Sequence, residues 1–407
     1  MISTLQRPPR TPAGQPLIRS FRDLESGAID RDQPVVTLFS GGLDSTYLLH
    51  RLALAGFRNV HAVSVDLGAG EDPVEQQRLA DLLGVRLHVI DGRNIFAEDY
   101  VRPAISAQAV YLDTHPISSS LSRPLIAEIA LRIAEELRAS CILHTANRSQ
   151  NTLRRLNGAF DLLGYAGRYG TPYDLDPVGR EQKANELRVL GFDPLSTRVA
   201  SVDSNLWCRE FESGILDDPE HHLVPDHMYL WSAEHRGKRD DRIEVAFKAG
   251  VPQSVDGVEL PLVALVETLN RRVGAFGIGR YSGLEHLPGG PKVLELREMP
   301  AAWLLLRTYR QLELASLDAE TIRQKMQLEQ IWVREALEGR WFGELREATQ
   351  SFIDTCAARV TGTVRWRLSS GTAMTESIVA ENPLYLRSRE DWEKESIQTE
   401  SAAFRCT

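Results

Sequence analysis

The chain has 407 residues, of which 43% are apolar and 25% charged, typical of a globular protein that can bury a large core. Its net charge of −9 argues against a general nucleic-acid or anionic-membrane binder, because both need a basic face. The four cysteines form no Cys-x-x-Cys pair, which argues against a zinc ribbon and suits a reducing cytosol. We find no signal peptide or apolar membrane-spanning run, and therefore expect a cytoplasmic protein.

After a proline-containing extension over residues 1–33, the chain alternates predicted strands and helices. The strands, short and rich in β-branched residues, are expected over 34–39, 59–66, 86–90 and 140–144. The helices, with apolar residues at helical spacing, are expected over 43–54, 72–83 and 121–137. This alternation predicts an α/β domain with a doubly wound parallel sheet over residues 34–192. Ligands of such sheets bind at the carboxyl ends of the strands.

The regular alternation ends near residue 195, so a second, α+β domain is expected over residues 193–380. Its predicted strands cover 242–247 and 361–368, and its predicted amphipathic helices cover 263–272, 301–314 and 319–337. Residues 381–407 are charged and are expected to form a short C-terminal tail.

The first predicted strand runs into Ser40-Gly41-Gly42-Leu43-Asp44-Ser45-Thr46 and then a helix. The glycines let backbone N–H groups approach an anion, and the helix N-terminus adds partial positive charge. No lysine follows the glycines, so this is not the loop of kinases and GTPases. Asp44 alone would repel phosphate, so its presence predicts a Mg²⁺ ion between its carboxylate and the phosphates.

The loop resembles the pyrophosphate loop of ATP pyrophosphatases, which cut ATP between its α and β phosphates. Further segments resemble argininosuccinate synthases and occur in that family's order along the chain. They are Ser118–Pro124 (SSSLSRP), Ser201–Trp207 (SVDSNLW), Gly214–Pro219 (GILDDP), Lys248–Pro252 (KAGVP), Gly277–Arg280 (GIGR) and Arg297–Ala302 (REMPAA). Together they cover about residues 34–395 and are far more specific than the loop alone.

The resemblance implies a HUP-like nucleotide-binding domain followed by an α+β synthetase domain, and an enzyme that joins citrulline and aspartate with ATP. It assigns ATP binding to Leu38, Ser40, Gly41, Gly42, Leu43, Asp44, Ser45, Thr46, Val65 and Thr145. Asp44, Ser45 and Arg123 are the expected catalytic residues, with Asp44 as the Mg²⁺ ligand. The expected substrate-binding residues are His115, Ser120, Asn147, Asn151, Thr152, Arg155, Ser201, Glu210, Glu285 and Arg297.

Several of these positions depart from the family pattern. His115 and Arg297 each stand where the family has a tyrosine, and Glu210 stands where it has a serine. Asn147 replaces a threonine and Thr152 an aspartate in the part that contacts the amine donor. A buried charge without a partner costs several kcal/mol. We therefore expect altered substrates, with Arg148, Arg154, Arg155 and Arg297 facing an anion, and Glu210 and Glu285 facing an amino or guanidino group.

Purely structural roles are also possible for several of these residues. Glu210 and Arg297 could form a structural salt bridge, His115 could be a surface loop residue, and Ser120 could be a helix N-cap. The whole chain could be an ordinary argininosuccinate synthase, or a nucleotide-binding regulator without turnover. We expect small-molecule substrates, an acid or ureido acceptor and an amine donor. We also expect a homo-oligomer: a dimer is plausible and a tetramer doubtful, because the chain lacks the long C-terminal helix usual in the family.

Overall fold

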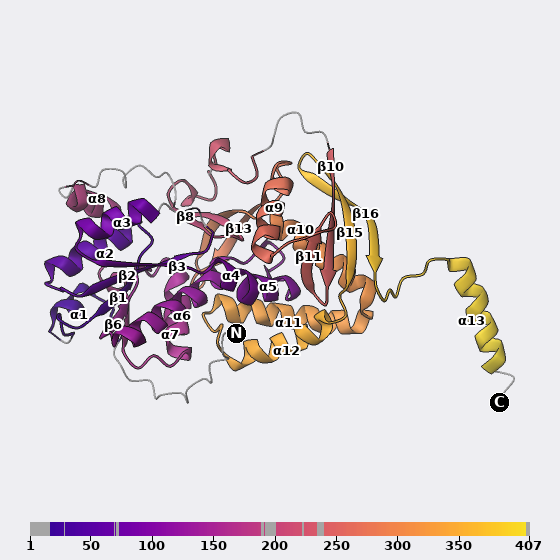
Figure 1. Cartoon of the computed structure of the whole chain (residues 1–407), viewed down its shortest axis with the longest axis horizontal. Helices are drawn as coiled ribbons and strands as arrows, with labels where there is room; N and C mark the ends of the chain where they lie inside the picture. Colours follow the sequence, from indigo (N-terminus) through magenta and orange to yellow (C-terminus); the bar gives the residue numbers. More distant parts are fainter. Residues whose placement is uncertain are drawn as a thin grey trace.

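The computed structural model describes residues 17–27, 29–68, 70, 73–188, 191, 201–221, 224–233 and 240–403. The expectations for residues 1–16, 193–200 and 404–407 fall outside the described residues, as does Asp72 at the start of one expected helix. Ser201 is described by its backbone alone. Figure 1 shows two halves that are built on different sheets.

The N-terminal half contains a five-stranded parallel sheet in the order β3-β2-β1-β6-β7. Its strands are β1 (Val35–Leu38), β2 (Val60–Asp66), β3 (Arg86–Asp91), β6 (Cys141–Leu143) and β7 (Arg168–Gly170). The first four confirm predicted strands, whereas β7 was not predicted. Parallel neighbours cannot be joined by a tight turn, and helical segments connect β1 to β2, β2 to β3 and β6 to β7.

The longer helices of this half are α2 (Leu43–Leu54), α3 (Pro73–Leu82), α6 (Ser119–Leu137), α7 (Thr152–Leu162) and α8 (Arg180–Arg188). The predicted helices over 43–54, 72–83 and 121–137 are confirmed as α2, α3 and α6, whereas α7 and α8 were not predicted. The shorter elements are α1 (Phe21–Glu25), α4 (Arg93–Ile95), the π-helix η1 (Phe96–Val101), α5 (Arg102–Ser106), the small strands β4 (Val110–Tyr111) and β5 (His115–Pro116), and the 3₁₀ helix η2 (Pro172–Asp174). In the described part of the expected extension, Phe21 is buried and packs edge-on against Tyr47 and Tyr173.

The C-terminal half holds two antiparallel sheets, in the orders β12-β11-β10-β15-β16 and β13-β14-β9-β8. The strands are β8 (Ser201–Ser204), β9 (Arg209–Glu212), β10 (Asp240–Lys248), β11 (Val251–Val255), β12 (Val258–Glu259), β13 (Arg280–His286), β14 (Lys292–Glu298), β15 (Gly362–Ser369) and β16 (Thr372–Ala380). The helices are α9 (Leu262–Gly274), α10 (Pro300–Ser316), α11 (Ala319–Leu337) and α12 (Glu344–Ala357), with 3₁₀ turns η4 (Gly214–Leu216) and η5 (Asp226–Met228). The expected strands and helices of this half are confirmed.

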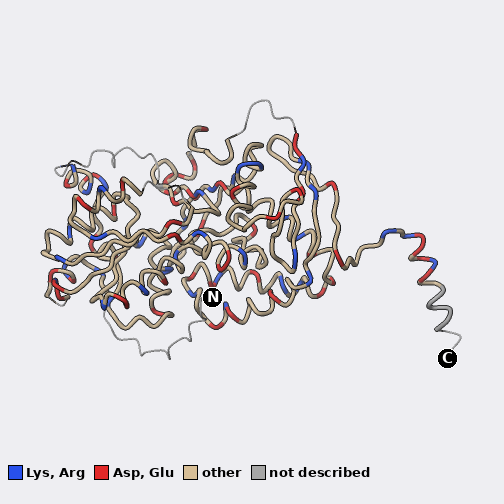
Figure 2. Tube along the Cα trace, in the orientation of Figure 1, with Lys and Arg blue, Asp and Glu red and all other residues tan. Residues whose placement is uncertain are grey.

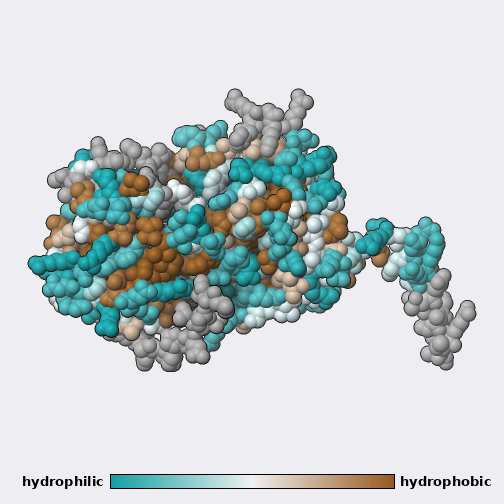
Figure 3. Space-filling model, viewed as in Figure 1, coloured by the Kyte–Doolittle hydropathy of each residue, from teal (hydrophilic) through white to brown (hydrophobic). Residues whose placement is uncertain are grey.

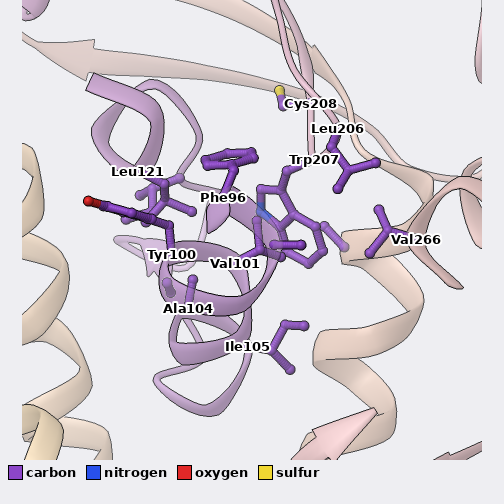
Figure 4. Close-up of a cluster of buried hydrophobic side chains, with 14 of the residues drawn as sticks. Phe96, Tyr100, Val101, Ala104, Ile105, Leu121, Leu206, Trp207, Cys208 and Val266 are labelled. Carbon is purple, nitrogen blue, oxygen red and sulfur yellow. The ribbon is translucent and has the colours of Figure 1, made fainter. Parts of the chain in front are cut away.

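Trp207 joins the two halves. It lies between β8 and β9, is 1% exposed, and packs in one hydrophobic cluster with Phe96, Val101 and Val266 (Figure 4). The Oδ1 of Asn205 accepts hydrogen bonds from the Trp207 and Cys208 backbone amides at 2.9 and 3.0 Å, which fixes the turn before β9. Strand β9, which carries two acidic residues of the site, is therefore held at the junction of the halves.

The expected tail contains a helix, α13 (Arg389–Ala403), that projects away from the body (Figure 1). Trp392 and Ile397 on this helix are 52% and 65% exposed. Among the residues that the structure describes, no helix combines the length and apolar character needed to cross a membrane.

Candidate functional site: a phosphate loop beside a buried ionic cluster

The glycine-rich loop leaves the carboxyl end of β1 and turns directly into α2. Gly41 has φ of +69°, a conformation that favours glycine, and Gly42 occupies the N-cap position of α2. The Ser45 hydroxyl donates to the Gly42 carbonyl at 3.1 Å, and the Gly42 amide donates to Ser40 Oγ at 3.3 Å. The loop is thus a tight turn at a helix N-terminus, the geometry that binds phosphate in many folds.

A cavity of about 320 Å³ opens over this loop. Leu38, Val65 and Thr145 lie in its wall, at or after the ends of three neighbouring parallel strands. From the other half, Asp203 and Glu212 close the cavity. This is the place where a parallel sheet binds its ligand.

Arg123 lines the same cavity from the first turns of α6. Its guanidinium forms an ion pair with Asp203, and its Nε donates to Thr152 Oγ1 at 3.3 Å. The arginine is therefore held in place by an acidic residue of β8 and a hydroxyl of α7. A charge oriented in this way can counter phosphate charge without first being reorganised.

Asp44 offers the cavity one carboxylate at the start of α2. Mg²⁺ is commonly bound in nucleotide sites by one or two carboxylates together with phosphate oxygens and water. The donor set present, a carboxylate beside the hydroxyls of Ser40 and Ser45, therefore fits Mg²⁺·ATP. Asp44 Oδ1 also accepts a hydrogen bond from Lys183 Nζ at 2.8 Å.

A second group of functional candidates lies in a buried ionic cluster, defined here as His115, Arg155, Glu210, Glu285, Glu295 and Arg297. Arg297 is 2% exposed, and its guanidinium contacts three carboxylates. These are Glu210 at 2.9 Å, Glu285 at 3.1 Å and Glu295. Arg155 binds Glu285 from the opposite side and donates to Ser119 Oγ at 2.7 Å.

The cluster is assembled from β5, α7, β9, β13 and β14. Strand register sets its geometry, because Arg297 of β14 pairs directly across from Glu210 of β9. His115 is 1% exposed, with its Nε2 3.9 Å from Glu285 Oε2, so it is not a surface loop residue. Gly283 makes room for it, since a Cβ there would lie 2.5 Å from His115 Nδ1.

The cluster holds three carboxylates against two guanidinium groups. Burial and the neighbouring carboxylates raise the pKa of Glu210 and Glu295 well above the ordinary range. Burial also lowers the pKa of Arg297 to about 9, which leaves it charged at neutral pH. The ligand atoms of His115, Glu285 and Glu295 lie close enough for a metal ion, but the Arg297 guanidinium already lies between the two carboxylates and serves as their cation.

We expect the excess carboxylate to make stability fall as pH rises. The native state keeps a proton on the cluster that the unfolded chain releases above its ordinary glutamate pKa of about 4.3. Between that pH and the raised native pKa, unfolding releases a proton, so the free energy of unfolding decreases by about 1.4 kcal/mol per pH unit. Glu295→Gln balances the cluster and should flatten this slope.

Urea unfolding of the wild type and Glu295→Gln from pH 5 to pH 8 tests this prediction. The variant should gain stability relative to the wild type toward pH 8. Glu344→Gln, on the exposed first turn of α12, is the matched control and should follow the wild-type profile. Parallel profiles for all three proteins would contradict an excess carboxylate in the cluster.

The predicted residues thus fall into distinct groups. The cavity wall contains Leu38, Ser40, Gly42, Leu43, Asp44, Ser45, Val65, Arg123, Thr145 and Thr152. Gly41 and Thr46 lie in the loop and the first turn of α2 but outside that wall, and Thr46 is fully buried. His115, Arg155, Glu210, Glu285 and Arg297 meet in the ionic cluster.

Asn151 borders the cluster, because its Nδ2 donates to Glu285 Oε1 at 2.7 Å. Asn147 lies in a local turn and accepts from the Ser149 hydroxyl at 2.7 Å. Ser120 is buried in the first turn of α6, whose N-cap position is Ser118, so Ser120 is not the helix cap. Ser201 begins β8, and its side chain is outside the described structure.

The four arginines that were expected to face a substrate anion each form an ion pair with a carboxylate of the protein. Arg148 binds Asp174 at 2.6 Å and Arg154 binds Glu338 at 2.9 Å, while Arg155 and Arg297 bind the cluster carboxylates. The guanidino groups that Glu210 and Glu285 contact belong to the protein itself: Arg297 contacts both, and Arg155 contacts Glu285. The salt bridge between Glu210 and Arg297, left open from the sequence, is present.

The residues of the site that were not predicted include Asp203 and Glu212 of the cavity, Glu295 of the cluster, and Lys183. Glu295 had a signal in the sequence, because it lies two residues before Arg297 and so on the same face of a strand. Lys183 had none, since the helix that carries it is mostly polar and only its packing brings it to Asp44.

Comparisons with known proteins agree with this architecture. Residues 34–164 match the family model of the arginosuccinate synthase N-terminal HUP domain, and residues 200–404 match that of the C-terminal domain. The chain belongs to the argininosuccinate synthase family. The family assignment made from the sequence motifs is therefore confirmed, and with it the general class of ATP-dependent ligase.

Bacterial members are similar along most of their length. The chain is 34% identical over 373 residues to the argininosuccinate synthase of Rubrobacter xylanophilus, which covers 91% of both chains. It is also 34% identical over 358 residues to that of Oceanobacillus iheyensis, covering 87% of this chain and 86% of the relative. The similarity to argininosuccinate synthases therefore extends over both halves of the chain.

Proposed function

We propose that this family member is an AMP-forming C–N ligase with altered substrates. It adenylates a ureido or carboxylate oxygen with Mg²⁺·ATP, releases pyrophosphate, and condenses the activated carbon with an amine. The observation that carries the altered specificity is the buried position of Arg297. Three carboxylates hold its guanidinium among residues that the family resemblance assigns to the acceptor.

The proposal rests on the effect that the Arg297 guanidinium would have on acceptor binding. The family resemblance gives a tyrosine and a serine at the positions of Arg297 and Glu210. Here both side chains are ionisable and buried, and the Arg297 Nε donates to Glu210 Oε2 at 2.9 Å. A citrulline ureido group would have to break a desolvated ion pair to reach Glu285, which costs several kcal/mol. A smaller acceptor, or one that binds on the cavity side of the cluster, avoids that cost.

The chain's own residues then have separate roles. The backbone of Ser40–Thr46 and the α2 N-terminus bind the phosphates, and Arg123, oriented by Asp203, counters the charge that develops on them. Asp44 would hold Mg²⁺, which supplies charge neutralisation to the leaving pyrophosphate. A ureido or carboxylate carbon is a poor electrophile, so the rest of the site mainly positions the acceptor and the amine.

The deciding experiment measures pyrophosphate and AMP release with Mg²⁺·ATP across a panel of ureido and carboxylic acids, with and without amino acids. Release that needs a pair other than citrulline and aspartate supports the proposal. Rapid release with citrulline and aspartate identifies an ordinary argininosuccinate synthase, the activity named for its relatives. ATP binding without release from any pair favours a nucleotide-binding regulator.

We further propose that the protein works in the cytoplasm as a homo-oligomer, a dimer or a tetramer. Two features support self-association. Helix α13 projects from the body with Trp392 and Ile397 exposed. Figure 3 shows an apolar area on the viewed face of the parallel-sheet half. Val89 of β3 is 46% exposed. Basic and acidic residues are interspersed along both halves in Figure 2, in keeping with small-molecule substrates and no nucleic acid.

A further inference from the structure

The phosphate loop has a counter-ion that comes from outside it. Lys183, on α8, is 6% exposed and is not among the residues that line the cavity. Its Nζ donates to Asp44 Oδ1 at 2.8 Å and lies 4.4 Å from the centre of the Tyr173 ring. The Tyr173 hydroxyl donates to the Asp44 backbone carbonyl at 3.0 Å, so the same aromatic residue supports both partners.

Helix α8 is fixed firmly enough to hold this lysine in one place. Leu187 is fully buried in the core beneath α2, and Glu186 accepts a hydrogen bond from the Tyr47 hydroxyl at 2.8 Å. Tyr47 and Asp44 both belong to α2, so two polar links join the helices. Lysine is one of the residues least often buried unless paired, and here its partner is the one carboxylate of the phosphate loop.

The charges at the loop suggest a role for the pair of Lys183 and Asp44. Asp44 lines the cavity with its side chain 36% exposed, so its negative charge faces the position where the phosphates bind. In the absence of a cation, it would repel ATP. The Lys183 ammonium cancels that charge before any ligand arrives. Because the loop sequence itself has no lysine, α8 supplies a cation that the loop does not contain.

We propose that Lys183 is a positioning residue of the phosphate loop, which neutralises and orients Asp44 and thereby sets how strongly ATP binding depends on Mg²⁺. This inference rests on the proposed ATP-dependent function. With Lys183 in place, Asp44 does not need a metal ion to accept phosphate nearby, so Mg²⁺ raises the affinity for ATP only modestly. Without Lys183, a bare carboxylate faces the phosphates and the metal ion becomes necessary.

Calorimetric titration with α,β-methylene-ATP, in EDTA and in excess MgCl₂, tests the proposal on the full-length protein. The quantity measured is the ratio of the two affinities. Lys183→Met should raise that ratio about tenfold, a typical size for coupling between two ligands, mainly by weakening metal-free binding. Lys183→Arg keeps the charge and should retain the wild-type ratio.

Asp44→Asn provides the second arm, because it removes the carboxylate on which Lys183 acts. In that background, Lys183→Met should leave the ratio unchanged. A purely structural lysine would weaken binding equally with and without Mg²⁺, and either that result or the same rise in the Asp44→Asn background overturns the proposal. A wild-type protein that binds no nucleotide under either condition overturns the proposed function as well, which separates the two failures.

Discussion

Replacing Arg297 with methionine is expected to lower the free energy of unfolding by about 3–5 kcal/mol, the scale for breaking a buried ion pair. The guanidinium contacts Glu210, Glu285 and Glu295, and only Arg155 would remain to balance their charge. The loss comes from buried carboxylates without a partner rather than from lost volume, since methionine fills a similar space. Urea unfolding followed by circular dichroism measures it.

Arg242→Met is the matched control, because Arg242 pairs with Glu376 in an exposed position on β10. Its replacement should change stability little, as exposed pairs contribute little. Adding Glu295→Gln to Arg297→Met should recover part of the loss, because the two residues are in direct contact. Similar losses in the Arg297 and Arg242 variants would show that the cluster is not a desolvated network.

Asp44→Asn is expected to slow pyrophosphate release by about 100-fold or more, with little effect on folding. The change removes the carboxylate that would hold Mg²⁺ at the phosphates, and one electrostatic contribution of this kind is commonly worth about 3–4 kcal/mol in the transition state. Steady-state release with the best substrate pair measures the rate, and thermal unfolding measures the fold. Asp354→Asn, on the exposed face of α12, should retain full activity. Equal rates for the two variants would remove Asp44 from the mechanism.

Much of the fold could be predicted because its signals are local. Buried parallel strands such as Val35–Leu38 are short runs of β-branched residues, and Leu43–Leu54 shows its apolar face in sequence. The strands β13 and β14 were missed for a physical reason. Their inward positions include Glu285, Glu295 and Arg297, and charged residues in a buried network give no apolar alternation.

The candidate site divides in the same way. Ser40–Thr46 are consecutive, so the sequence motif by itself predicts that these residues lie together in one loop. The ionic cluster depends on the register of β14 against β9 and on the approach of α7, which the sequence does not contain in any one segment. The charge changes at Glu210 and Arg297 were visible from the family resemblance, but that they satisfy each other, with Glu295 as a third partner, required the structure.

The charge balance of the ionic cluster also constrains how this protein could have diverged from its relatives. A serine-to-glutamate change at position 210 without Arg297 would bury an unpaired anion, and Arg297 without Glu210 would lose one of its three partners. The effect of each substitution is therefore expected to depend on the other, with glutamate at position 210 favoured only where Arg297 is present. Replacement of Arg297 should accordingly be tolerated better after Glu210 has been replaced, because Glu210→Ser alone leaves two carboxylates against Arg155 and Arg297.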